Sequence, residues 1–387
     1  MHFYLVIIAF LIPLFVVGWI HPKIVEIALA KDIVDKPGAR KLQRKPIPVL
    51  GGVAIFFGIV VGMGCVSEIV NTKSLLIVVM AAIIMLYTGT IDDILHLTPT
   101  SRLLIEIVVG LLLIFVGGYC LDDFHGLWGI EQIPGWLAVP LTIVASVGII
   151  NAINLIDGVN GLSSGFCIMA SAMFGTLFYL SGDITMTVLA AVSAGALIPF
   201  FFHNVFGKTS KMFIGDGGTL VMGIIMSVFV IETLRHNSPS ASYVDPNIGL
   251  IPFSLAALAV PVFDTLRVML TRILRGTSPF HSDKTHIHHV FIDLGCSHIT
   301  TTLIVLGLNA SVVLCWWAAT ALGASIDVQL YTVVVAGIAV TCGLYHFMEY
   351  QRYHNTRLMG IMRRLGYRTH ISRRRFFLWL QNTMDKI

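Results

Sequence analysis

Residues 75–93 read LLIVVMAAIIMLYTGTIDD, an apolar stretch that ends on two adjacent carboxylates. A helix that crosses the hydrocarbon core of a bilayer needs roughly 20 mostly apolar residues. The stretch therefore predicts a membrane-spanning helix near 74–91, with Asp92 and Asp93 at one of its polar ends.

The whole chain repeats this pattern of long apolar segments and short polar connections. Of its 387 residues, 56% are hydrophobic and 12% are charged, against about 25% charged in ordinary globular domains. Backbone groups in lipid must form hydrogen bonds within their own segment, so we expect an all-α, polytopic helical bundle. About eleven transmembrane helices are expected, near 3–20, 50–69, 74–91, 101–120, 136–153, 163–181, 184–202, 217–234, 249–270, 301–321 and 329–348.

Lys and Arg indicate which side each loop faces, because cytoplasmic loops are enriched in them. Of 25 such residues, only Lys73 and Arg235 fall in loops after even-numbered spans. We therefore expect the N-terminus outside and the C-terminus inside. The first segment lacks a basic start and a cleavage site, so we expect it to stay as a span and not to be a signal peptide.

Two parts of the chain differ in composition. Residues 1–348 form the predicted transmembrane domain, and residues 349–387 form a basic cytoplasmic tail that supplies much of the net charge of +4. Arginines followed by aromatic residues in the tail indicate either an interfacial helix on the inner leaflet or a plain topology signal. Basic residues beside spans usually meet anionic lipids, so no nucleic-acid binding is expected.

The Asp92-Asp93 pair lies on the predicted cytoplasmic side. Adjacent carboxylates repel each other, so one is expected to take a proton or to find a cation. Mg²⁺ bound to phosphates is such a cation, because it usually takes only one or two protein carboxylates. The alternative is a solvated helix end, which is our interpretation of Asp122-Asp123 on the opposite side.

Two glycine-containing motifs lie on the same side as this pair. Residues 151–162 read NAINLIDGVNGL, and a helical turn would align Asn151, Asn154 and Asp157 on one face. Residues 213–219 read FIGDGGT, where Asp216 is either a helix N-cap or a carboxylate presented to a metal–phosphate complex. Glycines in both motifs permit close approach of the backbone to a ligand.

A basic, histidine-rich loop follows the ninth expected span. It reads RGTSPFHSDKTHIHH over residues 275–289, after Arg267 and Arg272 at the end of the span. No Cys or Glu is spaced to complete a zinc site. Cations and imidazoles beside a glycine turn suit an anionic, sugar-bearing ligand, although a histidine-rich loop without a function is the alternative.

The motifs expected on the cytoplasmic side, and their order along the chain, resemble those of the polyprenyl-phosphate N-acetylhexosamine-1-phosphate transferases of the glycosyltransferase family 4 type. These membrane enzymes start glycan assembly on a lipid carrier. The resemblance runs from Asp35 to about His289 and comprises DKPxxRK…PxxGG, the DD pair, NxxNxxDGxxGL, GDxG and PFxxDxxHxHH. It is closest to the branch that acts on UDP-N-acetylglucosamine and undecaprenyl phosphate, which also has eleven spans. The UDP-MurNAc-pentapeptide branch typically has ten spans and a different histidine loop.

The resemblance implies a role for each matching residue. The implied catalytic residues are Asp92, Asp93 and Asp157, and the implied ligands of Mg²⁺ (or Mn²⁺) are Asn154 and Asp216. The implied substrate-binding residues are Asp35, Lys36, Arg40, Lys41, Gly158, Asn160, Arg267, Arg272, His286, His288 and His289. Two features depart from the common pattern, because Asn160 stands where many relatives have a second Asp and no third carboxylate follows the DD pair.

The implied reaction transfers N-acetylglucosamine 1-phosphate from UDP-N-acetylglucosamine to undecaprenyl phosphate and releases UMP. It would start synthesis of a cell-surface glycan at the cytoplasmic face of a bacterial inner membrane. Direct attack by the acceptor phosphate and a covalent intermediate on Asp92 or Asp93 both fit the sequence. The alternative donors are another UDP-N-acetylhexosamine and UDP-MurNAc-pentapeptide, and a homodimer is compatible with small residues on helix faces.

Two other classes of membrane protein compete with this interpretation. A secondary transporter would place ionisable residues near the bilayer midplane, whereas the acids here gather at the expected span ends, with Glu106 as the main exception. A lipid-binding scaffold would give no reason for five polar motifs on one side of the membrane.

Overall fold

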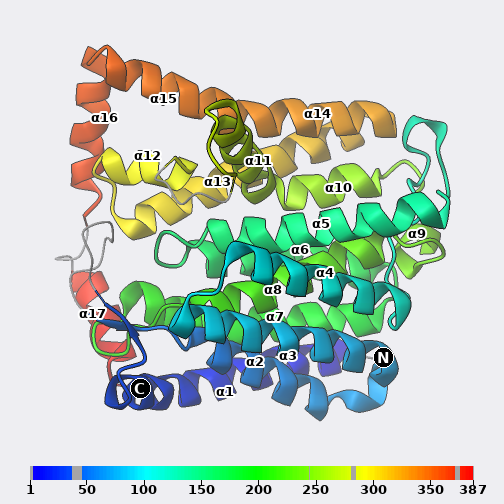
Figure 1. Cartoon of the computed structure of the whole chain (residues 1–387), viewed down its shortest axis with the longest axis horizontal. Coiled ribbons are helices and arrows are strands. Elements are labelled where there is room, and N and C mark those ends of the chain that lie inside the picture. The colour runs from blue at the N-terminus through cyan, green and yellow to red at the C-terminus, as the bar shows by residue number, and fades with distance from the viewer. Residues whose placement is uncertain (1–2, 37–45, 244, 280–284, 371–374, 387) are drawn as a thin grey trace.

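The computed structural model describes residues 3–36, 46–243, 245–279, 285–370 and 375–386. Long helices run side by side through this part of the chain (Figure 1). Those that overlap the expected spans are α1 (Phe3–Ala30), α2 (Gly51–Cys65), α3 (Thr72–Leu95), α4 (Pro99–Phe115), α5 (Gly135–Leu155), α6 (Leu162–Leu180), α7 (Ile184–Phe206), α8 (Gly215–Leu234), α10 (Leu250–Ala257) with α11 (Ala259–Leu274), α13 (His298–Ala321), and α14 (Ile326–Ile338) with η3 (Ala339–Gly343) and α15 (Leu344–Tyr353).

Length and composition identify a multi-pass membrane protein. Eight helices of the described ranges are long and apolar enough to cross a bilayer, or nine if the bent pair α10–α11 is one span. Helices α2 and α4 are shorter, with 15 and 17 residues. The count of eleven spans and the direction of the two termini therefore stay predictions.

The ninth expected span is broken, which the sequence pattern did not predict. Helices α10 and α11 meet at Leu258 with a bend of 75°. Asn309 of α13 compensates for the break, because its side chain accepts a hydrogen bond from the N–H of Val260 (2.9 Å) and donates to the carbonyls of Ala256 (3.3 Å) and Ala257 (3.1 Å). Backbone groups released inside a bilayer need such internal partners.

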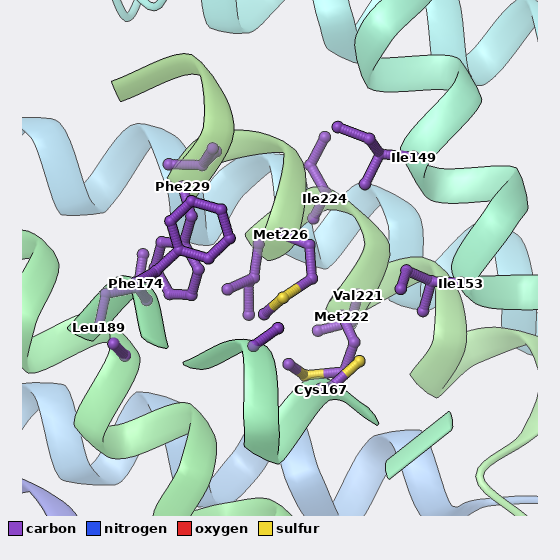
Figure 2. Close-up of a cluster of buried hydrophobic side chains, with 14 of the residues drawn as sticks. Ile149, Ile153, Cys167, Phe174, Leu189, Val221, Met222, Ile224, Met226 and Phe229 are labelled. Atoms are coloured by element: carbon purple, nitrogen blue, oxygen red, sulfur yellow. The ribbon is translucent and has the colours of Figure 1, made fainter. Parts of the chain in front are cut away.

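Helix α8 lies at the centre of the bundle. Every residue from Gly217 to Leu234 is buried, which fits a helix that is apolar on all sides. Apolar side chains of α6 pack against those of α8 (Figure 2). The rings of Phe174 on α6 and Phe229 on α8, for example, lie 5.7 Å apart. This packing fixes the position of α8 within the bundle.

Glycines bring neighbouring helices into backbone contact with that end of α8. A Cβ atom on Gly52 of α2 would collide with the backbone of Gly218, and one on Gly89 of α3 would collide with the backbone of Asp216. Small residues allow this close approach between helices in a membrane. The Asp216 motif is therefore held against the ends of two other helices.

Smaller elements complete the end of the bundle that carries the motifs. Two short strands, β1 (Val34–Asp35) and β2 (Ile47–Pro48), form an antiparallel ribbon that an all-α fold did not anticipate. The Phe213 N–H donates to the carbonyl of Pro48 (2.8 Å), so the ribbon is joined to the segment before α8. The remaining elements are η1 (Ser67–Ile69), η2 (Leu127–Gly129), α9 (Pro239–Tyr243), α12 (Ile287–Asp293), α16 (Arg357–Arg368) and α17 (Arg375–Met384).

Candidate functional site

Three helix ends meet at one polar cavity of about 910 Å³. Helix α3 contributes Asp92 and Asp93, α5 contributes Asn154, and α8 contributes Asp216. The other predicted site residues that line this cavity are Asp35, Lys36, Asp157, Gly158, Asn160 and His289. Arg40 and Lys41 lie outside the described residues. Motifs from distant parts of the sequence are thus brought together at one place.

Asn154 connects α5 directly to α8. Its Nδ2 donates to Oδ1 of Asp216 (2.6 Å) and to the hydroxyl of Thr219 (2.7 Å). Its Oδ1 accepts a hydrogen bond from Nη2 of Arg102 (2.9 Å). Asn154 therefore orients the Asp216 carboxylate, and the oxygen that was predicted to bind a metal is here engaged by a cation.

The two adjacent carboxylates of α3 have different surroundings. Asp93 accepts from the backbone N–H of Asp216 (3.1 Å) and of Gly217 (3.4 Å), so it caps the first turn of α8. A carboxylate is stabilised there by the unpaired N–H groups and the helix dipole. Asp92 accepts from the N–H of Leu97 (2.8 Å) and lies 3.4 Å from Nη1 of Arg102. Asp93 thus joins α3 to α8, while Asp92 faces α4.

Arg102 is one residue of this region that sequence reasoning missed. Its guanidinium contacts Asp92 and Asn154, forms an ion pair with Glu106 (3.1 Å) and donates to Oδ1 of Asn151 (3.2 Å). Glu106 is almost fully buried and accepts from Asn151. The spacing of Arg102 and Glu106 by four residues in an apolar helix was the available signal, because two opposite charges there require each other.

Asp157 lies in the connection between α5 and α6, where it is partly buried and lines both this cavity and a smaller one beside it. Burial raises the pKa of its carboxyl to about 7, against the effect of a hydrogen bond from the Ser163 hydroxyl (2.5 Å) and with a smaller contribution from the charge of Asp216. The residue therefore changes its protonation near neutral pH, and substrate charges placed beside it would alter that balance.

The histidine loop forms a second, smaller cavity of about 290 Å³ next to the first. Its lining includes His286, His288 and Arg272, and it shares Asp157, Gly158 and His289 with the larger cavity. Burial lowers the pKa of His288 well below the usual range, so its imidazole is neutral. Neither ring nitrogen of His288 has a hydrogen-bond partner among the described residues. His288 is therefore a buried, unpaired imidazole at the lining of the smaller cavity, packed against Gly158.

Asp264 organises this loop from α11. It forms an ion pair with Arg267 (2.6 Å), contacts Nδ1 of His286 (2.9 Å) and accepts from the N–H of Ile287 (3.2 Å). The Arg267 guanidinium also stacks over the ring of Tyr345, with 3.9 Å between its carbon and the ring centroid. Arg267 lines neither cavity. The structure thus places it behind the loop, in contrast to the predicted direct contact with substrate.

Comparison with known proteins shows the family to which this chain belongs. Residues 75–234, from α3 to α8, match the profile of glycosyl transferase family 4. A Bacillus subtilis (strain 168) protein named "Probable undecaprenyl-phosphate N-acetylglucosaminyl 1-phosphate transferase" is 32% identical over 301 residues, which are 78% of this chain and 81% of the relative. The chain belongs to glycosyl transferase family 4.

Two further relatives of this family 4 protein are named "Undecaprenyl-phosphate alpha-N-acetylglucosaminyl 1-phosphate transferase". The one from Escherichia coli O157:H7 is 28% identical over 273 residues, 70% of this chain and 72% of the relative. The one from Salmonella typhi is 25% identical over 326 residues, 84% of this chain and 80% of the relative. Family 4 membership and the apolar helices together identify a membrane-embedded glycosyltransferase.

The donor set of this family 4 site suits one class of metal ion. Among the described residues, no three or more His, Cys, Asp or Glu side chains are arranged to enclose an ion. Mg²⁺ on a phosphate needs no such enclosure, since one or two carboxylates, water and the phosphate oxygens complete its coordination. Asp216, oriented by Asn154 and facing the cavity, offers such a carboxylate. The residues fit a metal–phosphate complex.

Lys211 and His298 are among the cavity-lining residues that were not singled out from the sequence. Lys211 lies in the segment between α7 and α8, and His298 is the first residue of α13. The ring of His298 accepts the N–H of Asn160 through Nδ1 (3.3 Å), which brings α13 to the connection after α5. Lys211 lies two residues before the FIGDGGT motif, which was the available signal for it, whereas no motif next to His298 marked that residue.

Proposed function

We propose that this protein transfers N-acetylglucosamine 1-phosphate from UDP-N-acetylglucosamine to undecaprenyl phosphate and releases UMP. The observation that carries the proposal is the contact of Asn154 with Asp216, beside Asp92, in a cavity built from the ends of apolar helices. The names of the relatives supply the lipid and the sugar. A sugar phosphate with a polyprenol tail requires a polar site at a lipid boundary, and a polar cavity at the ends of apolar helices supports such a site.

The proposed nucleophile is the phosphate of the lipid acceptor. A phosphate monoester has a second pKa near 6, so the acceptor is largely dianionic at neutral pH and needs no strong base. The obstacle is the approach of two anions. Lys31, Lys36 and Lys211 line the cavity and would offset that repulsion. Mg²⁺, held by Asp216 with Asn154 as its orienting partner, would supply further charge neutralisation.

Direct attack is favoured over a covalent aspartyl intermediate. Asp93 is held by two N–H groups of α8, and Asp92 is held by a backbone N–H and by Arg102. A nucleophilic role for either carboxylate would first require those contacts to break. Positioning of the two substrates supplies the remaining rate enhancement, because the carrier phosphate is fixed at the membrane edge.

The proposal includes the orientation of the protein. It places eleven spans in a bacterial cytoplasmic membrane, with the cavity and the C-terminal tail in the cytoplasm. The distribution of Lys and Arg supports this orientation. Short α2 would complete its crossing with the adjoining η1 segment, and α4 with the residues that follow Phe115. UDP-sugars are made in the cytoplasm, so the cavity would face its donor.

The purified full-length protein in detergent is expected to form a lipid-linked sugar pyrophosphate from undecaprenyl phosphate and UDP-N-acetylglucosamine. UMP should appear in equal amount. Chelation of divalent cations should stop the reaction and added Mg²⁺ should restore it. The carboxylates of the cavity and the phosphates of the two substrates repel each other unless a cation neutralises them. Radiolabelled donor and thin-layer separation of the lipid product measure the transfer.

Donor competition decides between this reaction and its alternatives. Faster transfer from UDP-N-acetylgalactosamine or from UDP-MurNAc-pentapeptide would reassign the sugar. Transport of labelled substrate into proteoliposomes, without any lipid product, would overturn the enzymatic proposal in favour of a transporter.

The contact between Gly158 and His288 provides a test of the histidine loop. A Cβ atom on Gly158 would collide with Nε2 of His288, so Gly158→Ala should displace the imidazole. We expect the KM for the UDP-sugar to rise about tenfold or more, as for the loss of one hydrogen bond to a charged ligand. Steady-state kinetics with varied UDP-sugar measure it.

Gly148→Ala is the matched control for this variant. Gly148 lies on α5, and a Cβ atom there meets no heavy atom within 4 Å. His288→Ala should raise the same KM, and the Gly158→Ala/His288→Ala double variant should be no worse than His288→Ala. Unchanged kinetics in both single variants would return the loop to a role without ligand contact.

A further inference from the structure

Lys211 brings a cation to a cavity otherwise rich in carboxylates. It lines the cavity together with Asp216 and Asp93, and no hydrogen bond or ion pair joins it to any described residue. Its neighbour in the cavity is His298. Partial burial lowers the pKa of its ammonium, so the charge is costly to keep there without a counter-ion. The group is therefore placed to receive an anionic ligand.

The segment that carries Lys211 is held in place from the far end of the chain. One carboxylate oxygen of Asp385 accepts from the N–H groups of Lys208 (2.9 Å), Thr209 (2.9 Å) and Ser210 (3.2 Å), and from the Ser210 hydroxyl (3.2 Å). Burial raises the pKa of Asp385, but these N–H groups outweigh it and hold the pKa below its usual range. Three consecutive N–H groups around one anion fix the course of the backbone directly before Lys211.

The same segment is also held from inside the bundle. The Ser210 carbonyl contacts Nε2 of His21 (2.8 Å), and the Ser210 hydroxyl contacts Nδ1 of His203 (3.0 Å). The two imidazoles are stacked with 4.3 Å between their centroids. Ser210 therefore has bundle contacts on one side and Asp385 on the other, and Lys211 follows it into the cavity.

The tail is docked at two places along the end of the bundle (Figure 1). Helix α17 packs on α7 through the rings of Phe377 and Phe206, 5.5 Å apart. Near the end of α16, the hydroxyl of Thr369 accepts the N–H of Ser297 (3.0 Å), next to cavity-lining His298. The tail thus contacts the segment that carries Lys211 and the segment that carries His298.

We propose that Asp385 is a positioning residue for the transferase site: it fixes the 208–210 backbone so that Lys211 binds a substrate phosphate. This inference rests on the proposed function for the identity of that phosphate. Both substrates offer the same chemistry, since the donor has a pyrophosphate and the acceptor has a phosphate monoester. The cytoplasmic tail is then part of the active site, in addition to any contact of its apolar side chains with lipid.

The test is a double-mutant cycle in the full-length protein. Lys211→Ala should raise the KM for one substrate about tenfold or more, the loss expected for one charge-assisted hydrogen bond. Asp385→Asn should raise the KM for the same substrate, with Asp385→Glu less affected, and the double variant should be no worse than Lys211→Ala. The substrate whose KM rises identifies which phosphate Lys211 binds.

Binding of UDP, measured by calorimetry in detergent, separates the two proposals. If the wild-type protein binds UDP but makes no lipid product, the proposed function fails. The UDP dissociation constants of Lys211→Ala and Asp385→Asn then still test whether Asp385 positions Lys211 to bind the phosphates of the nucleotide. Asp293→Asn is the matched control, because it removes another contact of the tail, the exposed ion pair with Arg352 (3.1 Å). Effects of Lys211→Ala and Asp385→Asn that multiply, or an Asp385→Asn protein that loses only thermal stability or kcat, would overturn the inference.

Discussion

Asp216→Asn is expected to reduce UMP release by about 10³-fold or more while the protein still folds and inserts. The substitution keeps the shape of the side chain, and its oxygen can still accept the hydrogen bond from Asn154. It removes the charge that a metal–phosphate complex requires, and lost charge stabilisation of a transition state costs about 10²–10³ even for a single donor. Initial rates at saturating Mg²⁺, with the thermal unfolding temperature beside them, measure the effect.

Asp245→Asn is the control for this variant, since Asp245 is an exposed carboxylate that lines neither cavity. It should retain the wild-type rate. Raised Mg²⁺ should not rescue Asp216→Asn if the carboxylate itself is needed. Retained Mg²⁺-dependent release of UMP by Asp216→Asn would contradict the assignment of Asp216 and return the GDGG motif to a helix cap.

The positions of the apolar helices could be predicted from the sequence because each one depends only on its own composition. Every expected span overlaps a helix of the structure. The break at Leu258 could not be predicted, because the partner that makes it tolerable is Asn309, on a different span. A residue that satisfies a distant backbone leaves no periodic signal in its own segment.

The same limit applies to the site. The sequence placed Asp92, Asp93, Asn154 and Asp216 on one side of the membrane, and they do meet. It treated Asp92 and Asp93 as equivalent, whereas Asp93 caps α8 and Asp92 faces Arg102. Adjacent side chains on a helix point about 100° apart, so the two face different neighbours. Which neighbour each one meets is decided by tertiary packing.

The broken span also bears on the transporter alternative. Transporters use broken helices near the midplane to bind their cargo, and α10–α11 has such a break. Here the released backbone groups are taken up by Asn309, and neither cavity is lined by residues 256–260. The break is thus filled with protein, while the polar cavity lies where α3 and α5 end and α8 begins. This arrangement favours an enzyme.

Arg102→Ala is expected to lower both stability and turnover, by two separable routes. It leaves the carboxylate of Glu106, only 1% exposed, without its cationic partner. Removal of one partner of a buried ion pair costs about 3–5 kcal/mol. It also releases Asp92 and the oxygen of Asn154, which we expect to reduce UMP release about 10²-fold, as when a group that orients a ligand is lost.

The double variant Arg102→Ala/Glu106→Gln separates the two routes. Gln removes the unpaired charge, so the thermal unfolding temperature should return most of the way to that of the wild-type protein. Turnover should stay low, because Asp92 and Asn154 still lack the guanidinium that holds their side chains in place beside Asp216. If turnover recovered together with stability, Arg102 would serve only to neutralise Glu106, and the orientation of Asp216 would depend on α5 and α8 alone.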